Sequence, residues 1–233
     1  MKKLTLLFLF LCAFSAQAEW KSVFISGDDS IPNFDNGRVT LSQMLESFGL
    51  ETQHQNHLTS EATLALGGVQ VASLQNIATT FRDLNVDKEN GRCFVFMTSH
   101  GIRNQGFYLS QSGLITPTQM ATLVDYACGE VPTVILVSAC YSGQFIEKLA
   151  GDNRVILTAA IKDRPSFGCS TDTTYTFWDE CVIDSFPVAS TWEELYSEVR
   201  SCVTEKELAL GFNPSLPQAS FGKNMRDLPL FNF

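Results

Sequence analysis

Basic residues are scarce in this sequence. Its 233 residues include 16 Lys and Arg against 25 Asp and Glu, which gives a formal net charge of −9. Proteins that bind nucleic acids carry basic faces that neutralise phosphates. The charge balance therefore argues against nucleic acid as a partner.

Long hydrophobic runs are also missing, apart from one at the N-terminus. An apolar run from Leu4 to Phe14 follows two lysines and precedes Ala16-Gln17-Ala18, a small-x-small pattern. This arrangement is typical of a secretory signal peptide, and the run is shorter than the roughly 20 residues that span a bilayer. The sequence therefore predicts a signal peptide at residues 1–18, cleaved before Glu19. We expect an exported protein, periplasmic or secreted, with no membrane span after cleavage.

Internal repeats, low-complexity runs and linkers are absent from the rest of the chain. Cleavage would leave 14 basic against 25 acidic residues, a net charge of −11, and 45% of the whole sequence is hydrophobic. Such a length and composition suit one globular domain with one substantial core. The sequence therefore predicts a single domain over residues 19–233.

Three segments, 93–98, 133–139 and 154–160, are apolar nearly throughout and are the most informative about the fold. Continuous apolar segments are typical of parallel strands covered on both faces. Their alternation with helical patterns predicts an α/β fold, a three-layer sandwich with a mainly parallel central sheet. The expected strands are 20–26, 93–98, 133–139 and 154–160, and the expected helices are 39–48, 73–84, one from Pro117 capped by Thr116, and 141–149, with a loop at 31–37 and a hairpin at 106–113.

Histidine is rare, with only three in the chain. His54 and His57 lie in a polar stretch, where we expect a solvated loop rather than a zinc site. His100 directly follows an apolar strand and precedes Gly101, a residue that lets the backbone turn tightly and approach a substrate. His100 is therefore the histidine with a candidate chemical role.

Cys140 has matching features. It ends the strand 133–139 and is expected to open a helix, whose N-terminus favours a thiolate. The carboxyl ends of parallel strands share one edge of a sheet, so His100 should lie where it can exchange a proton with Cys140. The alternative interpretation is a small core cysteine and a hydrogen-bonded core histidine.

The Cys-x-x-Cys pattern is absent, which argues against a thiol redox role. If Cys140 is a working nucleophile, the other five cysteines beyond the signal peptide form at most two disulfides. Cys93 begins one strand, and Cys128 ends the helix that leads to the next strand. We expect both at the sheet edge opposite His100 and Cys140, and we predict a bridge between them.

The order of the two residues narrows the class further. No histidine follows Cys140, which excludes the papain-like and α/β-hydrolase orders, whereas histidine before cysteine on neighbouring strands is the caspase-like arrangement. Residues 94–101, FVFMTSHG, resemble the His-Gly strand end of legumain-type peptidases, the asparaginyl endopeptidases. Residues 134–143, VILVSACYSG, resemble their E-A-C-x-S-G segment, and residues 158–160 and 166–169 resemble the following strand and substrate loop. The similarity runs from about Lys21 to about Phe186.

The resemblance implies a caspase-like fold and a cysteine endopeptidase that acts on peptide or protein substrates. Cys140 would attack the scissile carbonyl and form a thioester, and His100 would protonate the leaving amine. Backbone N–H groups of Cys140 and Gly101 would form the oxyanion hole. The mechanism requires no metal and no organic cofactor.

The sequence departs from the legumain pattern around the substrate pocket. Ser138 stands where that family has glutamate, and the Asn33-Phe34 match places Asp35 where that family has a pocket arginine. The family's pocket acid falls close to Asp163 or Arg164. An acidic pocket built from Asp35 would favour Lys or Arg at the cleavage site, whereas the alternative is a turn residue within 33–37.

Two other functions fit the same residues. A transamidase or peptide ligase would use the same dyad and resolve the acyl-enzyme with an amine, which product analysis with an added amine would reveal. A non-catalytic secreted binding protein would retain the fold, and its Cys140 would resist a thiol reagent. The sequence predicts neither a natural substrate nor an oligomeric state.

Overall fold

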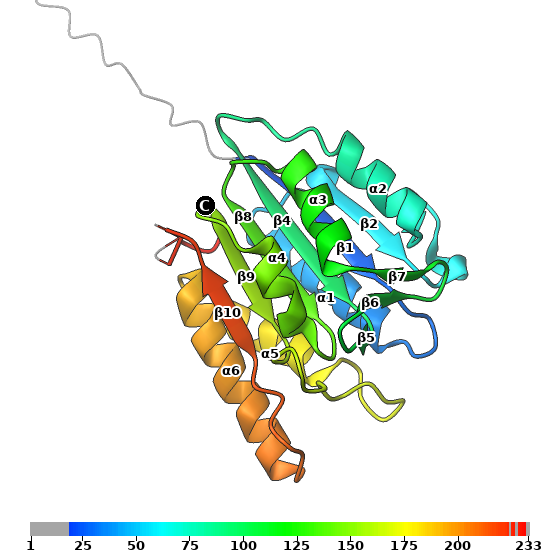
Figure 1. The fold of residues 1–233 in the computed structure, drawn as a ribbon, viewed down its shortest axis with the longest axis vertical. Coiled ribbons are helices and arrows are strands. Elements are labelled where there is room, and N and C mark those ends of the chain that lie inside the picture. Colours follow the sequence, from blue (N-terminus) through cyan, green and yellow to red (C-terminus); the bar gives the residue numbers. More distant parts are fainter. Residues whose placement is uncertain (1–18, 224, 227, 232–233) are drawn as a thin grey trace, which may run out of the picture.

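A central sheet covered by helices on both faces forms the body of the protein (Figure 1). The computed structural model describes residues 19–223, 225–226 and 228–231, so the predicted signal peptide lies outside the described residues. Within this part of the chain, no helix is long and apolar enough to cross a membrane.

The central sheet has seven strands in the order β10-β9-β8-β4-β1-β2-β3. All neighbouring pairs are parallel except β9 and β10, which are antiparallel. This confirms the predicted three-layer α/β fold with a mainly parallel sheet. The strands are β1 (Glu19–Ser26), β2 (Gln55–Thr59), β3 (Gln70–Val71), β4 (Gly91–Thr98), β8 (Thr133–Ser138), β9 (Arg154–Thr158) and β10 (Gln218–Phe221), and a separate three-stranded sheet contains β5 (Gly101–Ile102), β6 (Gly106–Leu109) and β7 (Gly113–Ile115).

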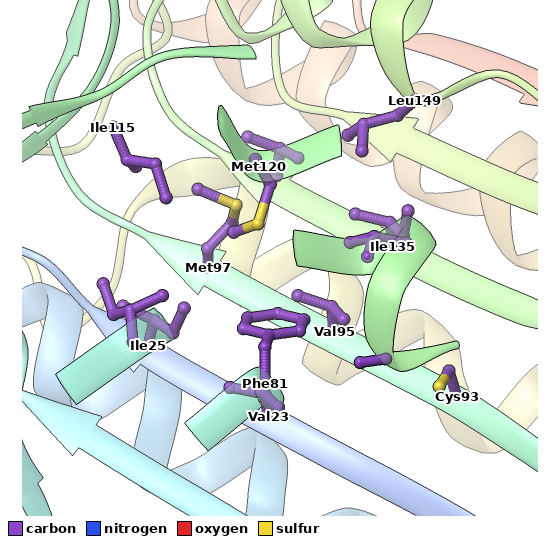
Figure 2. Packing of buried hydrophobic residues seen from close by; sticks show 14 of the residues in the cluster. Val23, Ile25, Phe81, Cys93, Val95, Met97, Ile115, Met120, Ile135 and Leu149 are labelled. Carbon is purple, nitrogen blue, oxygen red and sulfur yellow. The ribbon is translucent and has the colours of Figure 1, made fainter. Parts of the chain in front are cut away.

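The continuous apolar strands form because both faces of the sheet are buried. In β4, Cys93, Val95 and Met97 point into one core, and Phe94 and Phe96 point into the other. Alternate side chains of a strand point to opposite faces, so a strand between two cores must be apolar at every position. Figure 2 shows the first core, in which Phe81 and Met120 pack over β4.

Three helices cover each face of the sheet. Side chains of α2, α3 and α4 enter the first core, and those of α1, α5 and α6 enter the second. The helices are α1 (Asn33–Ser47), α2 (Leu74–Asp83), α3 (Pro117–Ala127), α4 (Ile146–Leu149), α5 (Phe177–Ser185) and α6 (Trp192–Ala209), and the short 3-10 turns are η1 (Thr52–His54), η2 (Ala62–Leu64), η3 (Ser142–Phe145) and η4 (Phe186–Val188).

The capping residues explain why α2 and α3 begin as the sequence predicts. The Ser73 hydroxyl accepts the Asn76 N–H, and Thr116 and Gln119 form a reciprocal capping box with Pro117 in the first turn. These side chains satisfy N–H groups that a helix start leaves without partners.

The loop predicted at 31–37 is wrong, because α1 already begins at Asn33. The polar residues at this helix start bond to distant segments instead of to their own backbone; Asn33 Nδ2, for example, donates to Thr173 O at 2.7 Å. Gly37 lies within the helix and lets Asp179 approach, since an added Cβ would be 2.8 Å from Asp179 Oδ2. Tertiary contacts therefore override the local turn signals.

The solvated loop predicted around His54 and His57 is also wrong. His54 ends η1, and His57 lies in β2 with its ring stacked on Phe24 at 5.2 Å. Burial, followed by the nearby Arg38 guanidinium, lowers the pKa of His57 to about 4. His57 is therefore a packed neutral side chain at neutral pH.

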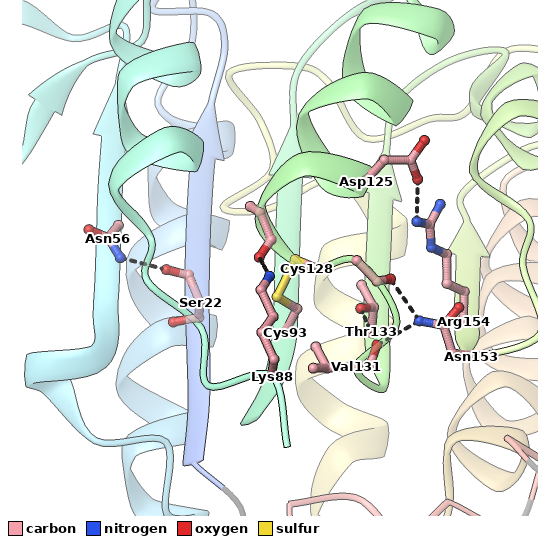
Figure 3. The surroundings of a disulfide bond; sticks show 12 residues. Ser22, Asn56, Lys88, Cys93, Asp125, Cys128, Val131, Thr133, Asn153 and Arg154 are labelled. Carbon is pink, nitrogen blue, oxygen red and sulfur yellow. Dashed lines mark hydrogen bonds and ion pairs between the residues drawn. A yellow bond between two sulfur atoms is a disulfide. The ribbon is translucent and has the colours of Figure 1, made fainter. Parts of the chain in front are cut away.

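Two disulfides fasten helices to the fold. The predicted bridge between Cys93 and Cys128 is confirmed, and it lies beneath the C-terminal end of α3 (Figure 3). A second bridge, which the sequence analysis did not assign, joins Cys181 of α5 to Cys202 of α6. Among the described residues, Cys140 and Cys169 remain as free thiols.

Candidate active site

His100 and Cys140 lie at the same edge of the sheet, as expected from the sequence. They follow β4 and β8, which are adjacent and parallel, with Thr98 opposite Ser138. Ser99 N donates to Ser138 O at 3.1 Å and extends the ladder to the residue before His100. A Cβ on Gly101 would be 1.8 Å from the carbonyl oxygen of Cys140. The backbone after the histidine thus packs directly against the cysteine.

Cys140 sits in a tight turn rather than at the start of a long helix. Tyr141 has φ of 58°, in the left-handed region, and is followed by η3 and the four-residue α4. The helix predicted over 141–149 is therefore wrong in its first turn, and a long-helix dipole does not act on the thiol. Instead, Cys140 Sγ lies 3.3 Å from the Ser166 N–H nitrogen, a donor that can stabilise a thiolate.

The imidazole of His100 lies beside two residues that the sequence analysis did not assign to the site. Its ring meets the ring of Phe34 edge-on, with centroids 5.1 Å apart. Its Nε2 lies 3.9 Å from Oδ1 of Asp28, whose side chain is only 6% exposed, whereas that of His100 is 43% exposed. Asp28 follows β1, the neighbour of β4 in the sheet. The rule that strand ends share an edge would have identified Asp28 as a candidate.

The Asp35 side chain bonds to the ends of β1 and β2. Its carboxylate accepts hydrogen bonds from Ser26 Oγ at 2.7 Å, Thr59 Oγ1 at 2.6 Å and Arg38 Nε at 2.7 Å. The alternative of a turn residue is wrong, because Asp35 lies in the first turn of α1. Asp35 lines a cleft of about 330 Å³. Its role in specificity stays a prediction.

Ser138 is buried beneath the site and connects β8 to the start of α5. Its Oγ lies 3.2 Å from Oγ1 of Thr176, the N-cap of α5. Asp179, in the first turn of α5, accepts a hydrogen bond of 2.7 Å from Thr98 Oγ1. Burial raises the pKa of Asp179 to about 6, against the opposing effect of hydrogen bonds from Ser138, Thr98 and Thr176. The carboxyl of Asp179 thus lies under both strand ends.

Arg164 lines a cleft close to the nucleophile candidate. Its carbonyl accepts the Tyr141 N–H at 2.8 Å, and its guanidinium donates to Pro214 O at 2.8 Å. The cleft has a volume of about 510 Å³, and the stacked rings of Phe167 and Phe212 also line it, with centroids 4.4 Å apart. Asp163 is exposed beside it.

Cys169 is the second free thiol, on the same loop as Ser166. Burial raises its pKa to about 12, and the charges of Cys140, Asp179 and Asp28 act in the same direction. A thiol with such a pKa stays protonated near neutral pH and is a poor nucleophile. Between the two free thiols, Cys140 is therefore the candidate for chemistry.

The described residues contain no group of three or more His, Cys, Asp or Glu side chains arranged to hold a metal ion. The candidate site is built around the thiol of Cys140 and the imidazole of His100.

A mainly parallel sheet with histidine and cysteine at adjacent strand ends defines the class of caspase-like proteins. The crystal structure of caspase-1 from Spodoptera frugiperda aligns with a TM-score of 0.64 and 12% sequence identity, covering 91% of this chain and 89% of that chain. At this identity the likeness shows the fold alone.

The particular family follows from the sequence. The Peptidase C13 family model matches residues 74–227, and the chain belongs to this family. A search of curated proteins gave no match. The predicted legumain-type family and caspase-like fold are confirmed, and membership implies a cysteine peptidase with a protein substrate.

Proposed function

We propose that this chain is a cysteine endopeptidase in which Cys140 is the nucleophile and His100 the acid–base partner. The observation that supports this most strongly is the packing of Gly101 against the Cys140 carbonyl, whose oxygen would be only 1.8 Å from a Cβ at position 101. This packing holds the histidine loop beside a free cysteine at the carboxyl edge of the sheet. The Peptidase C13 match over residues 74–227 supports the same chemistry.

The proposed reaction has two steps, formation of a thioester on Cys140 and hydrolysis of that thioester. The Cys140 thiolate attacks the scissile carbonyl carbon, and collapse of the adduct breaks the C–N bond while His100 gives its proton to the departing amine. Water then attacks the thioester, His100 accepts a proton from it, and the acid product and free thiol are released. N–H groups of Gly101 and Cys140 are the proposed donors to the oxyanion.

The cleft beside Arg164 is the proposed binding region for part of the substrate. This cleft lies close to Cys140 in space. Ser166 contacts the Cys140 sulfur, and the carbonyl of Arg164 accepts a hydrogen bond from the backbone of Tyr141. Its aromatic walls and single guanidinium suit an extended peptide with apolar and acidic side chains. Asp163, which is exposed beside this cleft, is a further proposed substrate-binding residue. Ser138, expected from the sequence to bind substrate, is buried and bonded to Thr176, so we propose that it supports the site from beneath.

Export is part of the proposal. The sequence pattern at residues 1–18 and the two disulfides support a periplasmic or secreted location, because disulfides persist in oxidising compartments. Analysis of the N-terminus of the exported protein would show whether it begins at Glu19.

The test is cleavage of a peptide library by mature protein, with Cys140→Ala and His100→Ala as variants. We expect cleavage by the wild type and losses of about 10³-fold or more in both variants, because nucleophile and base act as a unit. Iodoacetamide should modify Cys140 selectively, since the pKa of Cys169 is raised to about 12. The control, Cys169→Ala, should still be labelled at Cys140.

Each other outcome has a definite meaning. Cleavage that survives in Cys140→Ala contradicts the assignment of the nucleophile. Products that incorporate an added amine identify a transamidase. A folded wild type with no cleavage and an unreactive Cys140 identifies a binding protein on the same fold.

A further inference from the structure

We propose that Asp28 is a positioning residue for His100: it keeps the hydrogen of the imidazole on Nε2 and leaves Nδ1 as the atom that exchanges a proton with Cys140. This inference rests on the proposed function. It adds a third side chain, from the loop after β1, to the pair that follows β4 and β8.

The side chain of Asp28 faces one nitrogen of the ring. Its Oδ1 lies 3.9 Å from His100 Nε2, and the carboxylate is 6% exposed. An ionised carboxylate can only accept hydrogen bonds, so the nitrogen that faces it carries a hydrogen in both the neutral and the charged ring. In the neutral ring, the lone pair is therefore on Nδ1. Hydrogen bonds of catalytic groups are often long before substrate binds, so a closure of about 1 Å would complete this contact.

Asp28 is itself held in place. Its Oδ1 accepts the Ser30 N–H at 2.9 Å and also contacts the Ser30 hydroxyl. The preceding residue, Gly27, donates its N–H to Thr98 O at 3.0 Å, and its carbonyl accepts the Ser110 N–H at 2.8 Å. The loop that carries Asp28 is thus bonded to β4 two residues before His100. Both partners are therefore anchored at the end of β4.

Phe34 restrains the same ring from another side. It is fully buried at the start of α1 and meets the imidazole edge-on, with centroids 5.1 Å apart. Restraint by an aromatic ring and a carboxylate fixes the plane of the imidazole and the direction of its nitrogens. A histidine that is 43% exposed would otherwise sample several rotamers.

The contact also matters after the proton has moved. Once Nδ1 has taken the thiol proton, the positively charged ring still faces the Asp28 carboxylate, so Asp28 orients the histidine throughout the attack on the substrate. The histidine is partly solvated, so we expect a smaller effect than in a buried catalytic triad.

The first test uses Asp28→Asn, which retains the size of the side chain and removes its charge. We expect kcat to fall by about 10- to 100-fold with KM within about threefold of wild type, because substrate contacts are unchanged. Asp29→Asn is the matched control; the adjacent residue is exposed, and we expect wild-type kinetics. Ser30→Ala should cause a smaller loss of kcat, because it frees one anchor of Asp28.

The second test does not need peptidase activity. The chain has three histidines, so ¹⁵N NMR of the imidazoles, assigned with His100→Ala, reports directly on the His100 tautomer. We expect hydrogen on Nε2 in the neutral ring of the wild type and a mixture of tautomers in Asp28→Asn. Unchanged signals from His54 and His57 would show that the variant is folded.

The outcomes separate this inference from the proposed function. A wild type that cleaves no peptide but has the Nε2–H tautomer overturns the proposed function and not the role of Asp28. A wild-type His100 with hydrogen on Nδ1, or an Asp28→Asn variant with unaltered kcat and tautomer, overturns the positioning role and leaves the dyad in place.

Discussion

Gly101 is a position in the candidate site that has no room for a side chain. An added Cβ would lie 1.8 Å from Cys140 O and 3.2 Å from Ala139 Cβ. The first distance is far inside van der Waals contact, and its partner is backbone that cannot rotate away. Glycine is required here by close approach of two backbones and not by an unusual φ.

Gly101→Ala should therefore push the loop that carries His100 away from Cys140. We expect kcat/KM to fall by about 10²-fold, because a displacement of about 1 Å at the reacting groups has an effect of this size. Gly151→Ala is the control: Gly151 precedes β9 at the other edge of the sheet, and its added Cβ comes no closer than 3.3 Å to any atom. Peptide cleavage by both variants gives the comparison. Wild-type activity in Gly101→Ala would mean that the loop adapts without moving His100.

Among elements, the N-terminal turn of α5 connects the strands that carry the candidate dyad. Thr176 bonds Ser138 at the end of β8, and Asp179 accepts a bond from Thr98 at the end of β4. The Oδ1 atom of Asp179 is buried and has no hydrogen-bond partner. Ionisation of this carboxyl is therefore unfavourable in the folded protein.

This burial predicts a pH effect on stability. The folded state raises the pKa of Asp179 from 3.8 to about 6, so the fold holds this proton more tightly than the unfolded chain does. The contribution of Asp179 is thus favourable below about pH 4 and is lost as pH rises to about 6, with a change on the order of 3 kcal/mol. Relative to wild type, Asp179→Asn should become more stable by this amount between pH 4 and pH 7.

Urea unfolding at the two pH values measures the difference. Asp184→Asn, an exposed change on the same helix, is the control and should track the wild type at both values. If Asp179→Asn also has the same pH dependence of stability as the wild type, the buried carboxyl ionises as easily in the folded protein as in the unfolded chain.

The elements that the sequence predicts well are those with strong local or periodic signals. The strands β4, β8 and β9 are apolar at nearly every position, and α2 and α3 have serine and threonine caps. The start of α1, the turn after Cys140 and the strand β2 with His57 were missed, because their conformations depend on distant partners such as Asp179, Arg164 and Phe24. In the candidate site, His100 and Cys140 could be predicted because each follows an apolar strand in the sequence. The rule that strand ends share an edge would also have identified Asp28, whereas the contact of Phe34 with His100 depends on α1, whose start the sequence did not predict.

At the scale of the whole molecule, the disulfides reinforce opposite faces of the sheet. Cys93 and Cys128 lie in the core under α2, α3 and α4, whereas Cys181 and Cys202 lie on the face of α5 and α6. They close loops of 35 and 21 residues in sequence separation. By chain entropy alone, such loops stabilise the fold by about 4 and 3 kcal/mol.

The paired variant Cys93→Ser with Cys128→Ser should lower the unfolding free energy by about 4 kcal/mol, and the Cys181→Ser with Cys202→Ser pair by about 3 kcal/mol. Differential scanning calorimetry would register a decrease in Tm of about 10 °C in each case. Cys169→Ser, which breaks no bridge, is the control. Changes below 0.5 kcal/mol in the paired variants would contradict a stabilising role.

The burial of these bridges has a practical side for anyone who purifies the protein. A reagent that restores an oxidised Cys140 also attacks disulfides, and the two bridges differ in their protection from it. Both sulfurs of Cys93 and Cys128 are fully buried, whereas Cys202 is partly exposed. A mild thiol buffer will therefore reactivate the nucleophile and spare the Cys93–Cys128 bridge, and prolonged treatment will first loosen α6 from α5.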